Sequence, residues 1–314
     1  PEVVRAMIRT VREAGATPMV GDSPGGRSDE KMIRHLAKVT GIGSVCEQEG
    51  VEFVLFINSE PVPYPEGKAE TSFDLTTHLG KVDGVISLPK LKTHVLTGLT
   101  CAVKNLYGMV PEGPTKSGLH MKHKNSRSFS EMLVDLAECA RPRLTVTDAI
   151  VGMDGEGPAA GRLKDIGLVI ASESTHALDA FVVNLVGARK NTVWTVEIAA
   201  ERGLISRRED GIEVVGETGA DFSIEGFSMP APPTMLNIIP VVMTDEVREA
   251  LKRRPIFARS RCNLCGSCIE ACPGGALRMG IRKPLIARDM CIECYCCSEV
   301  CPCRAVALKR MPIR

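Results

Sequence analysis

The stretch "CNLCGSCIEACPGGAL" at residues 262–277 is echoed by "CIECYCCSEVCPCRAV" at residues 291–306. With an offset of 29 residues, four cysteines and the proline after the last of them coincide, which indicates an internal duplication. Ten of the 13 cysteines lie between residues 262 and 303. Disulfide scaffolds spread their cysteines over the domain that they staple, whereas metal sites cluster them. The duplication therefore predicts a small metal-binding domain late in the chain.

Each half of the duplication has the spacing Cys-x₂-Cys-x₂-Cys-x₃-Cys-Pro, which is the run of bacterial ferredoxins. Three thiolates at this spacing can wrap around one cubane, and the fourth then faces the other cluster. The module resembles the two-cluster bacterial ferredoxin domain over roughly residues 255–310. We therefore expect two [4Fe–4S] clusters with crossed ligand sets. One set is Cys262, Cys265, Cys268 and Cys301, and the other is Cys272, Cys291, Cys294 and Cys297.

Zinc is the alternative metal, since four-cysteine zinc sites also use C-x₂-C pairs. Two identical four-cysteine runs, each closed by Cys-Pro, favour iron–sulfur clusters. Cys296 and Cys303 fall outside both runs, because Ser267 and Gly274 stand at the equivalent positions of the first half. We expect both to be small buried residues near the clusters. A second hypothesis makes them alternate ligands during assembly or damage.

The composition is that of a soluble globular protein, with 314 residues, 44% hydrophobic and 25% charged. No apolar run approaches the ~20 residues needed to span a bilayer. The opening "PEVVRAMIRTVREAG" predicts an amphipathic helix rather than a signal peptide. We therefore expect a cytoplasmic protein without a membrane segment. Because the first residue is Pro1, we also expect that the start of the domain is missing.

The charge is unevenly distributed. Residues 251–314 carry thirteen Lys and Arg against four Asp and Glu, whereas the preceding 250 residues carry 26 against 34. Two oxidised cubanes contribute about −4, which offsets only part of the excess. The remainder suits an acidic partner, and we predict a ferredoxin- or flavodoxin-like redox protein. Nucleic acid is an unlikely partner, because no aromatic residues or recognition motif accompany the basic residues.

The rest of the chain alternates between patterns of strand and helix. This predicts an α/β layered domain with a largely parallel or mixed sheet over residues 1–250, followed by a small α+β two-[4Fe–4S] ferredoxin-like domain over 251–314. The expected helices are 1–15, 29–40, 96–108, 128–140 and 175–187, and the expected strands are 18–20, 51–58, 82–89, 144–150, 166–172 and 235–243.

The segment "LPKLKTHVLTGLTCAVKNLYGMVPEGPTKSGLHMKHKN" at 88–125 follows a predicted strand end and continues into a predicted helix. Such junctions commonly bind anions in α/β domains. Lys92, His94 and Lys104 are candidate catalytic residues that bind an anionic group or supply protons, and Lys90, Asn105 and Asp22 are candidate cofactor-binding residues. Lys90, Lys92 and His94 alternate, so an extended chain would present them on one face. A solvated basic loop is the alternative.

Other polar clusters leave two readings open. The "GDSPGG" loop at 21–26 suits either a phosphate or a tight acid-bearing turn. The glycine-rich stretch at 148–161 offers carboxylates for Mg²⁺ or proton transfer, or is a plain loop. His120 and His123 form either a metal pair or part of a mobile basic loop. The carboxylates of 148–161 are Asp148, Asp154 and Glu156.

Three further residues lie near predicted helix starts. His176 and Asp179 begin the helix after strand 166–172, where capping and dipole compensation explain Asp179, and a role in a site is the alternative. Cys101 is expected to be a packing residue. The functional alternative is that the neighbouring cations lower the pKa of its thiol.

The segments 1–26, 88–125 and 146–161 together resemble the family called domain of unknown function 362, over roughly residues 1–250. The most specific marks are Pro-Lys-Leu-Lys-Thr-His (89–94), Ala-Val-Lys-Asn-Leu-x-Gly (102–108) and the 21–26 loop. The resemblance implies an α/β domain that often carries a ferredoxin module at one end and that normally begins further upstream. It implies no particular reaction.

Two functional hypotheses follow. In the first, the protein is an oxidoreductase or an oxidoreductase subunit, and the clusters relay electrons to an anionic substrate or cofactor at the Lys/His-rich segment. In the second, it is a non-catalytic carrier or adaptor whose large domain docks a redox partner. The Lys, His and Gly residues at predicted strand ends favour the first.

Overall fold

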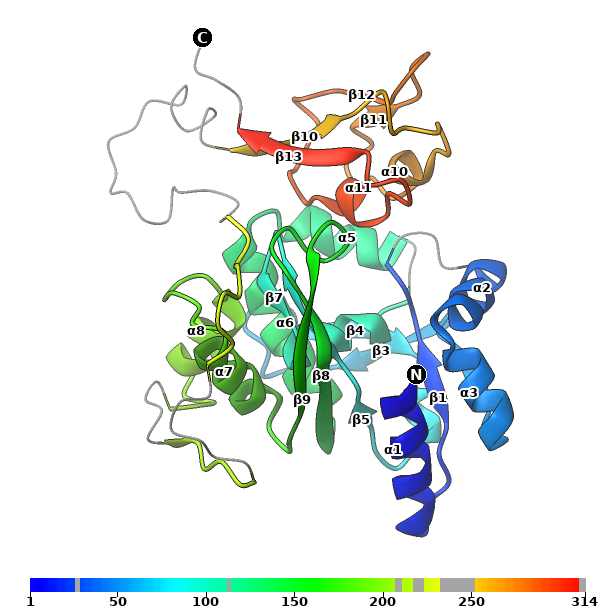
Figure 1. The fold of residues 1–314 in the computed structure, drawn as a ribbon, viewed down its shortest axis with the longest axis vertical. Helices are drawn as coiled ribbons and strands as arrows, with labels where there is room; N and C mark the ends of the chain where they lie inside the picture. Colours follow the sequence, from blue (N-terminus) through cyan, green and yellow to red (C-terminus); the bar gives the residue numbers. More distant parts are fainter. Residues whose placement is uncertain (26–28, 112–113, 207–210, 217–222, 232–251, 311–314) are drawn as a thin grey trace.

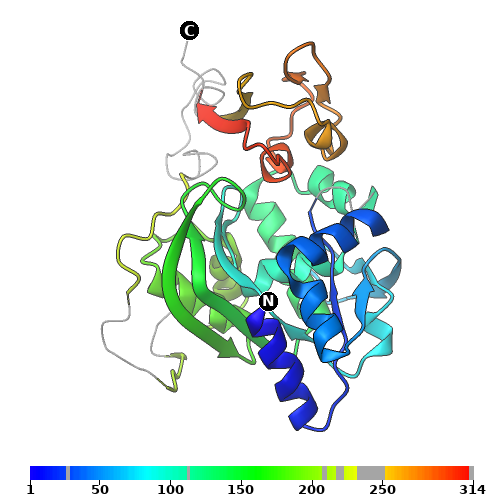
Figure 2. The same cartoon turned by 45° about the vertical axis from the view of Figure 1, so that its right-hand side comes forward.

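The computed structural model describes residues 1–25, 29–111, 114–206, 211–216, 223–231 and 252–310. An α/β body contains the first part of the chain, and a small C-terminal module sits against one end of it (Figure 1). The turned view in Figure 2 shows the same arrangement of body and module. The predicted domain boundary at 250/251 and the predicted strand at 235–243 lie outside the described residues.

A mixed sheet organises the body around one long strand, β8 (Leu144–Asp154). The antiparallel strand β9 (Arg162–Ser172) covers one edge of β8. The short strands β5 (Ile86–Ser87) and β6 (Lys90–His94) pair parallel with β8, and β7 (Gly98–Thr100) pairs antiparallel with β6. The α/β class and the mixed sheet are thus as the sequence predicted.

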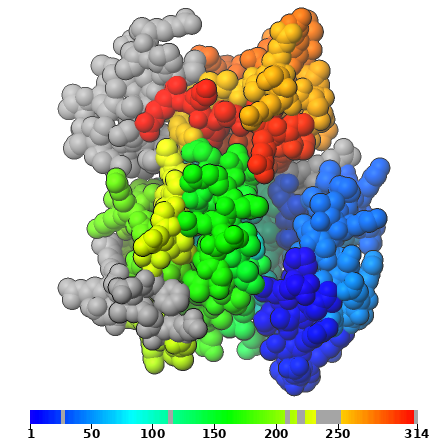
Figure 3. Space-filling view, in the orientation of Figure 1, coloured from blue at the N-terminus to red at the C-terminus, as the bar shows by residue number. Residues whose placement is uncertain are grey.

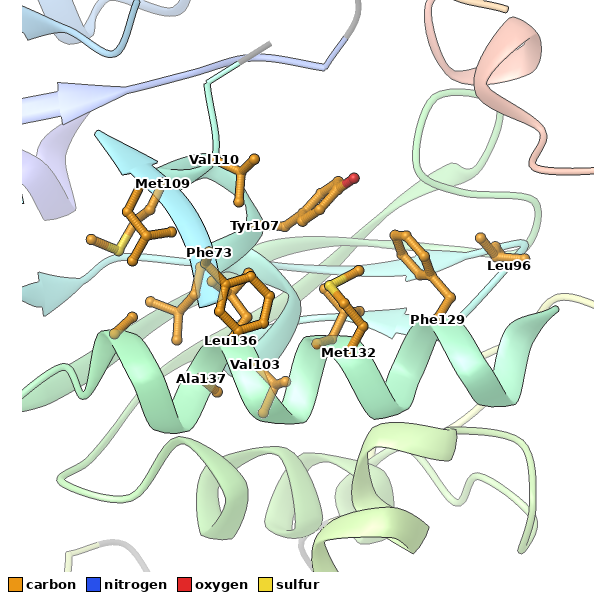
Figure 4. Packing of buried hydrophobic residues seen from close by; sticks show 14 of the residues in the cluster. Phe73, Leu96, Val103, Tyr107, Met109, Val110, Phe129, Met132, Leu136 and Ala137 are labelled. Carbon is orange, nitrogen blue, oxygen red and sulfur yellow. The ribbon is translucent and has the colours of Figure 1, made fainter. Parts of the chain in front are cut away.

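Helix α6 (Ser126–Ala140) forms the centre of the main hydrophobic core. It begins where the Asn125 side chain accepts a hydrogen bond from the backbone N–H of Ser128, at 2.8 Å, and it ends at Arg141, whose φ is 41°. Its apolar residues recur every three or four positions and so lie on one stripe. Figure 4 shows that stripe, including Phe129, Met132, Leu136 and Ala137.

Other helices flank the sheet. Helix α4 (Ala102–Asn105) and the 3₁₀ turn η2 (Leu106–Met109) contribute Val103 and Tyr107 to the same core (Figure 4). The remaining helices of this region are α5 (Pro114–Lys122), α7 (Thr175–Leu185) and α8 (Trp194–Glu201). A second core lies between the sheet and helices α7 and α8, whereas Leu119 of α5 packs against the main core.

The N-terminal part adds two small sheets beside the main one. Strands β1 (Val20–Asp22) and β2 (Phe53–Leu55) pair in parallel, and β3 (Ser59–Pro63) and β4 (Ser72–Thr76) form an antiparallel pair. Gly41, with φ 78°, ends one helix and lets the next begin immediately. The helices of this part are α1 (Glu2–Glu13), α2 (Glu30–Thr40), α3 (Ile42–Glu49) and the 3₁₀ turn η1 (Leu79–Lys81).

Two local predictions were wrong. The helix predicted at 96–108 begins with strand β7, and only its second half is helical. The physical reason is Gly98, whose φ of 80° reverses the chain after β6 where its hydrogen atom leaves room for the Thr192 carbonyl. The predicted mobile loop around His120 is helix α5, which extends to Lys122.

The C-terminal module repeats its own backbone. Helices α10 (Ser267–Glu270) and α11 (Cys296–Glu299) occupy equivalent positions of the two halves. The left-handed residues Leu264 and Gly266 have left-handed counterparts at Glu293 and Tyr295. The duplication is therefore structural as well as sequential. The strands of the module are β10 (Arg253–Phe257) paired with β13 (Val306–Arg310), and β11 (Leu277–Arg278) paired with β12 (Leu285–Ile286).

Replacement of Leu136 by Ala should lower the free energy of unfolding by about 2–5 kcal/mol, because its fully buried side chain would leave a cavity in the main core. Chemical denaturation followed by circular dichroism measures the loss. Leu163→Ala is the matched control, since Leu163 is 77% exposed and its truncation should change stability by less than about 0.5 kcal/mol. Equal losses in the two variants would contradict the proposed core.

Candidate cluster-binding and interdomain site

Two cavities of similar size lie inside the C-terminal module, one in each half. The first, which we call the outer cavity, has about 320 Å³ of empty space and is lined by Cys262, Cys265, Cys268 and Cys301. The second, the inner cavity, has about 350 Å³ and is lined by Cys272, Cys291, Cys294 and Cys297. The fourth cysteine of each run thus faces the cavity formed by the other run.

The cavities suit a group larger than one ion. Within the described ranges, no three His, Cys, Asp or Glu side chains approach closely enough to hold a single metal ion. The Ala276 N–H donates to Cys272 Sγ at 3.3 Å, and the Ala305 N–H donates to Cys301 Sγ at 3.2 Å. Four thiols around each space, with backbone N–H groups on their sulfurs, fit the needs of a [4Fe–4S] cluster.

The inner half of the module packs directly on the α/β body. Tyr295 is buried in the main core, and its hydroxyl donates to the Arg253 carbonyl at 3.2 Å. Cys296 Sγ lies 3.7 Å from His120 Nε2, and Glu299 Oε1 lies 3.0 Å from His94 Nε2. Figure 1 shows the corresponding helix α11 against α5. The inner cavity therefore borders the body, through helix α11.

The residues that meet at this junction come from five parts of the chain. Every residue of the set lies close enough to another member either to shift the pKa of that member or to have its own pKa shifted by it. Together they include three ammonium groups and two carboxylates. We call this set the interdomain basic site. Its members are Asp22, Lys92, His94, Lys104, Lys116, His120, Cys296 and Glu299.

His94 is neutral and has a defined tautomer. Burial lowers its pKa to about 4, and the nearby Lys104 ammonium acts in the same direction. Its Nδ1 accepts the Leu96 N–H at 3.1 Å, so the ring proton is on Nε2. That proton faces Glu299, although the approach is too oblique for a well-formed hydrogen bond.

Glu299 is the anion of the module half of the site. Burial alone would raise its pKa, but His94 and Lys104 hold the pKa at about 2, so the carboxylate is ionised at neutral pH. Burial also lowers the pKa of Lys104 and raises that of Asp22. The partial desolvation of these charges is offset by their mutual attraction.

Aromatic rings pack against the ammonium groups of Lys104 and Lys116. The rings of His120 and Phe129 stack with centroids 4.5 Å apart, and Tyr107 meets His120 edge-on. Lys116 Nζ lies 5.2 Å from the Tyr107 ring centroid, and Lys104 Nζ lies 5.6 Å from it. Burial lowers the pKa of His120 to about 4, so this ring is neutral as well.

Comparison with known proteins gives two matches to family models. The model described as Domain of unknown function (DUF362) matches residues 1–184, which is more than half of the chain. The chain belongs to this family. A second model, described as a 4Fe-4S dicluster domain, matches residues 254–302. The fusion of a DUF362 domain with a [4Fe–4S] module is thus confirmed, although the DUF362 match ends before the predicted residue 250.

A curated relative of this DUF362 protein is the thylakoid-associated protein sll1697 of Synechocystis sp. (strain ATCC 27184 / PCC 6803 / Kazusa). It is 34% identical over 211 residues, a match that covers 65% of this chain and 62% of the relative. Less than two thirds of the relative is therefore represented. In the part of the chain that the structure describes, no helix is long and apolar enough to cross a membrane. The expected cytoplasmic location stays a prediction.

The candidate residues of the DUF362 domain divide into two groups. The structure brings Lys92, His94, Lys104 and Asp22 together, as members of the interdomain basic site. Lys90 lies elsewhere, because a register shift in β6 separates it from Lys92 and its Nζ pairs with Asp148 at 2.9 Å.

Asn105 also lies apart from the site, since its Nδ2 donates to Ser87 Oγ at 3.0 Å. Sequence reasoning missed Lys116, His120 and Glu299 as partners of the predicted residues. The first two lie in the quoted 88–125 segment, where a helical reading would have shown their spacing of four. Only packing reveals Glu299.

The other DUF362 candidates have structural partners. Asp154 bonds to Arg162 at 3.1 Å, and Glu156 pairs with Arg253 of the module. The Asp179 carboxylate accepts hydrogen bonds from the N–H groups of Ala102 and Val103, so it caps α4 rather than its own helix.

Predictions at four other histidines and thiols can now be compared with the structure. His123 Nε2 contacts Glu70 Oε1 at 2.6 Å, and His176 Nε2 contacts Glu138 Oε1 at 2.9 Å. The suggested low pKa of the Cys101 thiol was wrong, because burial and then the Asp179 charge raise it. Cys303 lines the outer cavity beside its four cysteines.

The crossing of the two runs can be tested by replacing one cysteine at a time. We expect Cys301→Ser to perturb the same electron paramagnetic resonance signal as Cys262→Ser, because both thiols line the outer cavity. Cys272→Ser should instead match Cys291→Ser. Iron analysis of anaerobically reconstituted protein accompanies the spectra. Pairing of Cys301→Ser with Cys291→Ser would show that the runs are not crossed.

Proposed function

We propose that this DUF362 protein binds two [4Fe–4S] clusters and passes electrons, one at a time, to an anionic acceptor held at the interdomain basic site. The thiolates of Cys262, Cys265, Cys268 and Cys301 would hold one cluster, and those of Cys272, Cys291, Cys294 and Cys297 would hold the other. When bound, such clusters supply one-electron transfer.

The contact between helix α11 and the basic site is the observation that supports this proposal most. Cys296 and Glu299 lie in helix α11, which also carries Cys297 of the inner cavity, and they touch His120 and His94 of the α/β body. The Lys104 ammonium is thus close enough to Glu299 and Cys296 of α11 for both to influence its pKa. A bare electron carrier has no need for such a junction.

The charges of the site suit an anion that gains electrons. Lys92, Lys104 and Lys116 supply positive charge, and the single module carboxylate, Glu299, is already in contact with His94. Ammonium groups in a partly buried site attract an anionic acceptor more strongly than groups in open water. An acceptor that gains electrons also becomes more negative, so these groups favour the reduced product.

Protons have a defined source at the same place. The lowered pKa of Lys104 brings its ammonium nearer to proton donation, whereas the neutral His94 ring keeps its Nε2 hydrogen and can offer it only as a hydrogen-bond donor. Lys104 is therefore the residue that we propose to supply protons, and His94 would help to bind the anion as a hydrogen-bond donor. Lys92 would position the anion.

The proposal can be tested with two small one-electron acceptors of opposite charge. Reduced holoprotein is mixed in a stopped-flow instrument with ferricyanide or with hexaammineruthenium(III), and the return of cluster absorbance is followed. We expect Lys104→Met and Lys92→Met to slow ferricyanide about tenfold, because the site loses attraction for anions. The ruthenium rate should not fall.

Lys190→Met is the matched control, since Lys190 is an exposed lysine of the α/β body. It should leave both rates unchanged. If the ferricyanide rates of all three lysine variants equalled that of the wild type, electrons would leave elsewhere. The alternative function, a non-catalytic carrier whose large domain only docks a partner, would then be favoured.

The position of Glu299 predicts opposite shifts of one reduction potential. Glu299→Gln removes a negative charge beside the inner cavity and should raise the potential measured there, whereas Lys104→Met should lower it, each by tens of millivolts as an order of magnitude. Redox titration followed by electron paramagnetic resonance measures both. Glu270→Gln is the control from the equivalent position of the first half, and it should shift only the other signal. A shift of the same signal by Glu270→Gln and Glu299→Gln would contradict this placement.

A further inference from the structure

The outer half of the module exposes a group of apolar side chains. Leu264 is 40% exposed, Met279 48%, Ile281 94% and Leu285 44%. The turn between β11 and β12 brings them together, because Met279 lies against Gly266 and Leu285 lies against Gly280. We call these four residues the outer-face patch. It lies on the side of the module away from the α/β body (Figure 1, orange), and Figure 3 shows this part projecting from the surface.

The outer-face patch borders the outer cavity. Leu264 lines the cavity beside Cys265, and Pro284 of the β11–β12 turn lines it from the other side. Cys265 is itself exposed. A molecule that covered the patch would therefore come into contact with the thiol ring of this cavity.

Basic residues are concentrated in the segment that carries most of the patch, and the exposed Asp289 follows it directly. Residues 277–288 contain Arg278, Arg282, Lys283 and Arg288 and no Asp or Glu. The three arginines are exposed. The Lys283 ammonium donates to the Phe257 carbonyl at 3.4 Å, which holds the turn against the module. Exposed apolar side chains with exposed arginines in the same segment match an acidic surface that has an apolar centre.

The other half of the duplication shows what covers an equivalent face. Leu308, the counterpart of Met279, packs against the main core of the α/β body, and Tyr295, the counterpart of Gly266, is buried in it. The α/β body is thus the partner of the inner face. The outer face has kept the apolar side chains and has no such cover among the described residues.

We propose that the outer-face patch is the docking site of an acidic one-electron carrier protein, which delivers electrons beside Cys265. This inference rests on the proposed function, because it names the place where electrons would enter the module before they reach the interdomain basic site. A lipid surface fits the observations less well, since a membrane would cover the exposed thiol ring and separate it from water-borne donors. The reduced carrier would give one electron to the cluster held by the thiolates of the outer cavity and leave oxidised by one electron, while that cluster would be reduced by one electron.

The test uses holoprotein and an acidic flavodoxin as the probe. Ile281→Asp and Arg282→Glu are compared with two controls on the α/β body, Leu163→Asp, which alters a 77% exposed leucine, and Lys190→Glu. Binding of oxidised flavodoxin is measured by titration calorimetry at low salt. Reduction by flavodoxin hydroquinone is measured by stopped flow, and reduction by methyl viologen radical checks that the module is intact.

We expect each patch variant to weaken flavodoxin binding and to slow its reduction of the holoprotein by about tenfold, with unchanged methyl viologen rates. The controls should behave as the wild type does, and added salt should shrink the effect of Arg282→Glu. Cytochrome c is cationic. Arg282→Glu should therefore speed, rather than slow, the oxidation of the reduced holoprotein by oxidised cytochrome c.

Unchanged flavodoxin binding in both patch variants would overturn the inference. So would unchanged flavodoxin binding combined with lost binding to phosphatidylglycerol vesicles, because that result would identify a lipid surface. A failure of the proposed function would give a different pattern of ferricyanide and flavodoxin rates. In that case Lys104→Met would be reoxidised by ferricyanide at the normal rate, while Ile281→Asp would still be reduced slowly by flavodoxin.

Discussion

The contact of Glu299 with His94, beside the Lys104 ammonium, joins the two parts of this protein. A buried carboxylate needs cationic or hydrogen-bonding partners, and those of Glu299 come from β6 and α4 of the α/β body. The contact orients helix α11, and with it the loop around the inner cavity. The proposed electron transfer depends on this orientation, because it decides that the four cysteines of the inner cavity, rather than those of the outer cavity, lie nearer to the interdomain basic site.

The duplication explains why the module has two different faces. Its halves share backbone conformation at equivalent positions, yet Tyr295 replaces Gly266 and Cys296 replaces Ser267. These side chains fill the junction with the body, where an aromatic ring and a thiol make contacts that glycine and serine could not make. One repeat thus became an internal interface, while the other kept an open face.

Much of the fold could be predicted because its periodic segments are long. The stripe of α6 and the strands β8 and β9 carry strong patterns, and all three were expected. The prediction failed at Gly98, where one residue with positive φ turns a helical pattern into a strand pair. The prediction that Lys90 shares one face with Lys92 and His94 also failed. A bulge in β6 changes the direction of successive side chains, and no local sequence pattern predicts that bulge.

By itself, the sequence determined that the module suits [4Fe–4S] clusters, because the spacing of the cysteines within each run allows three thiols to face one common centre. It also determined which segment would carry the cations. Only the tertiary structure decided what those cations face. Glu299 lies about two hundred residues from His94 in the chain, and their meeting depends on how two domains pack, which follows from the shape and charge of whole surfaces rather than from any local pattern.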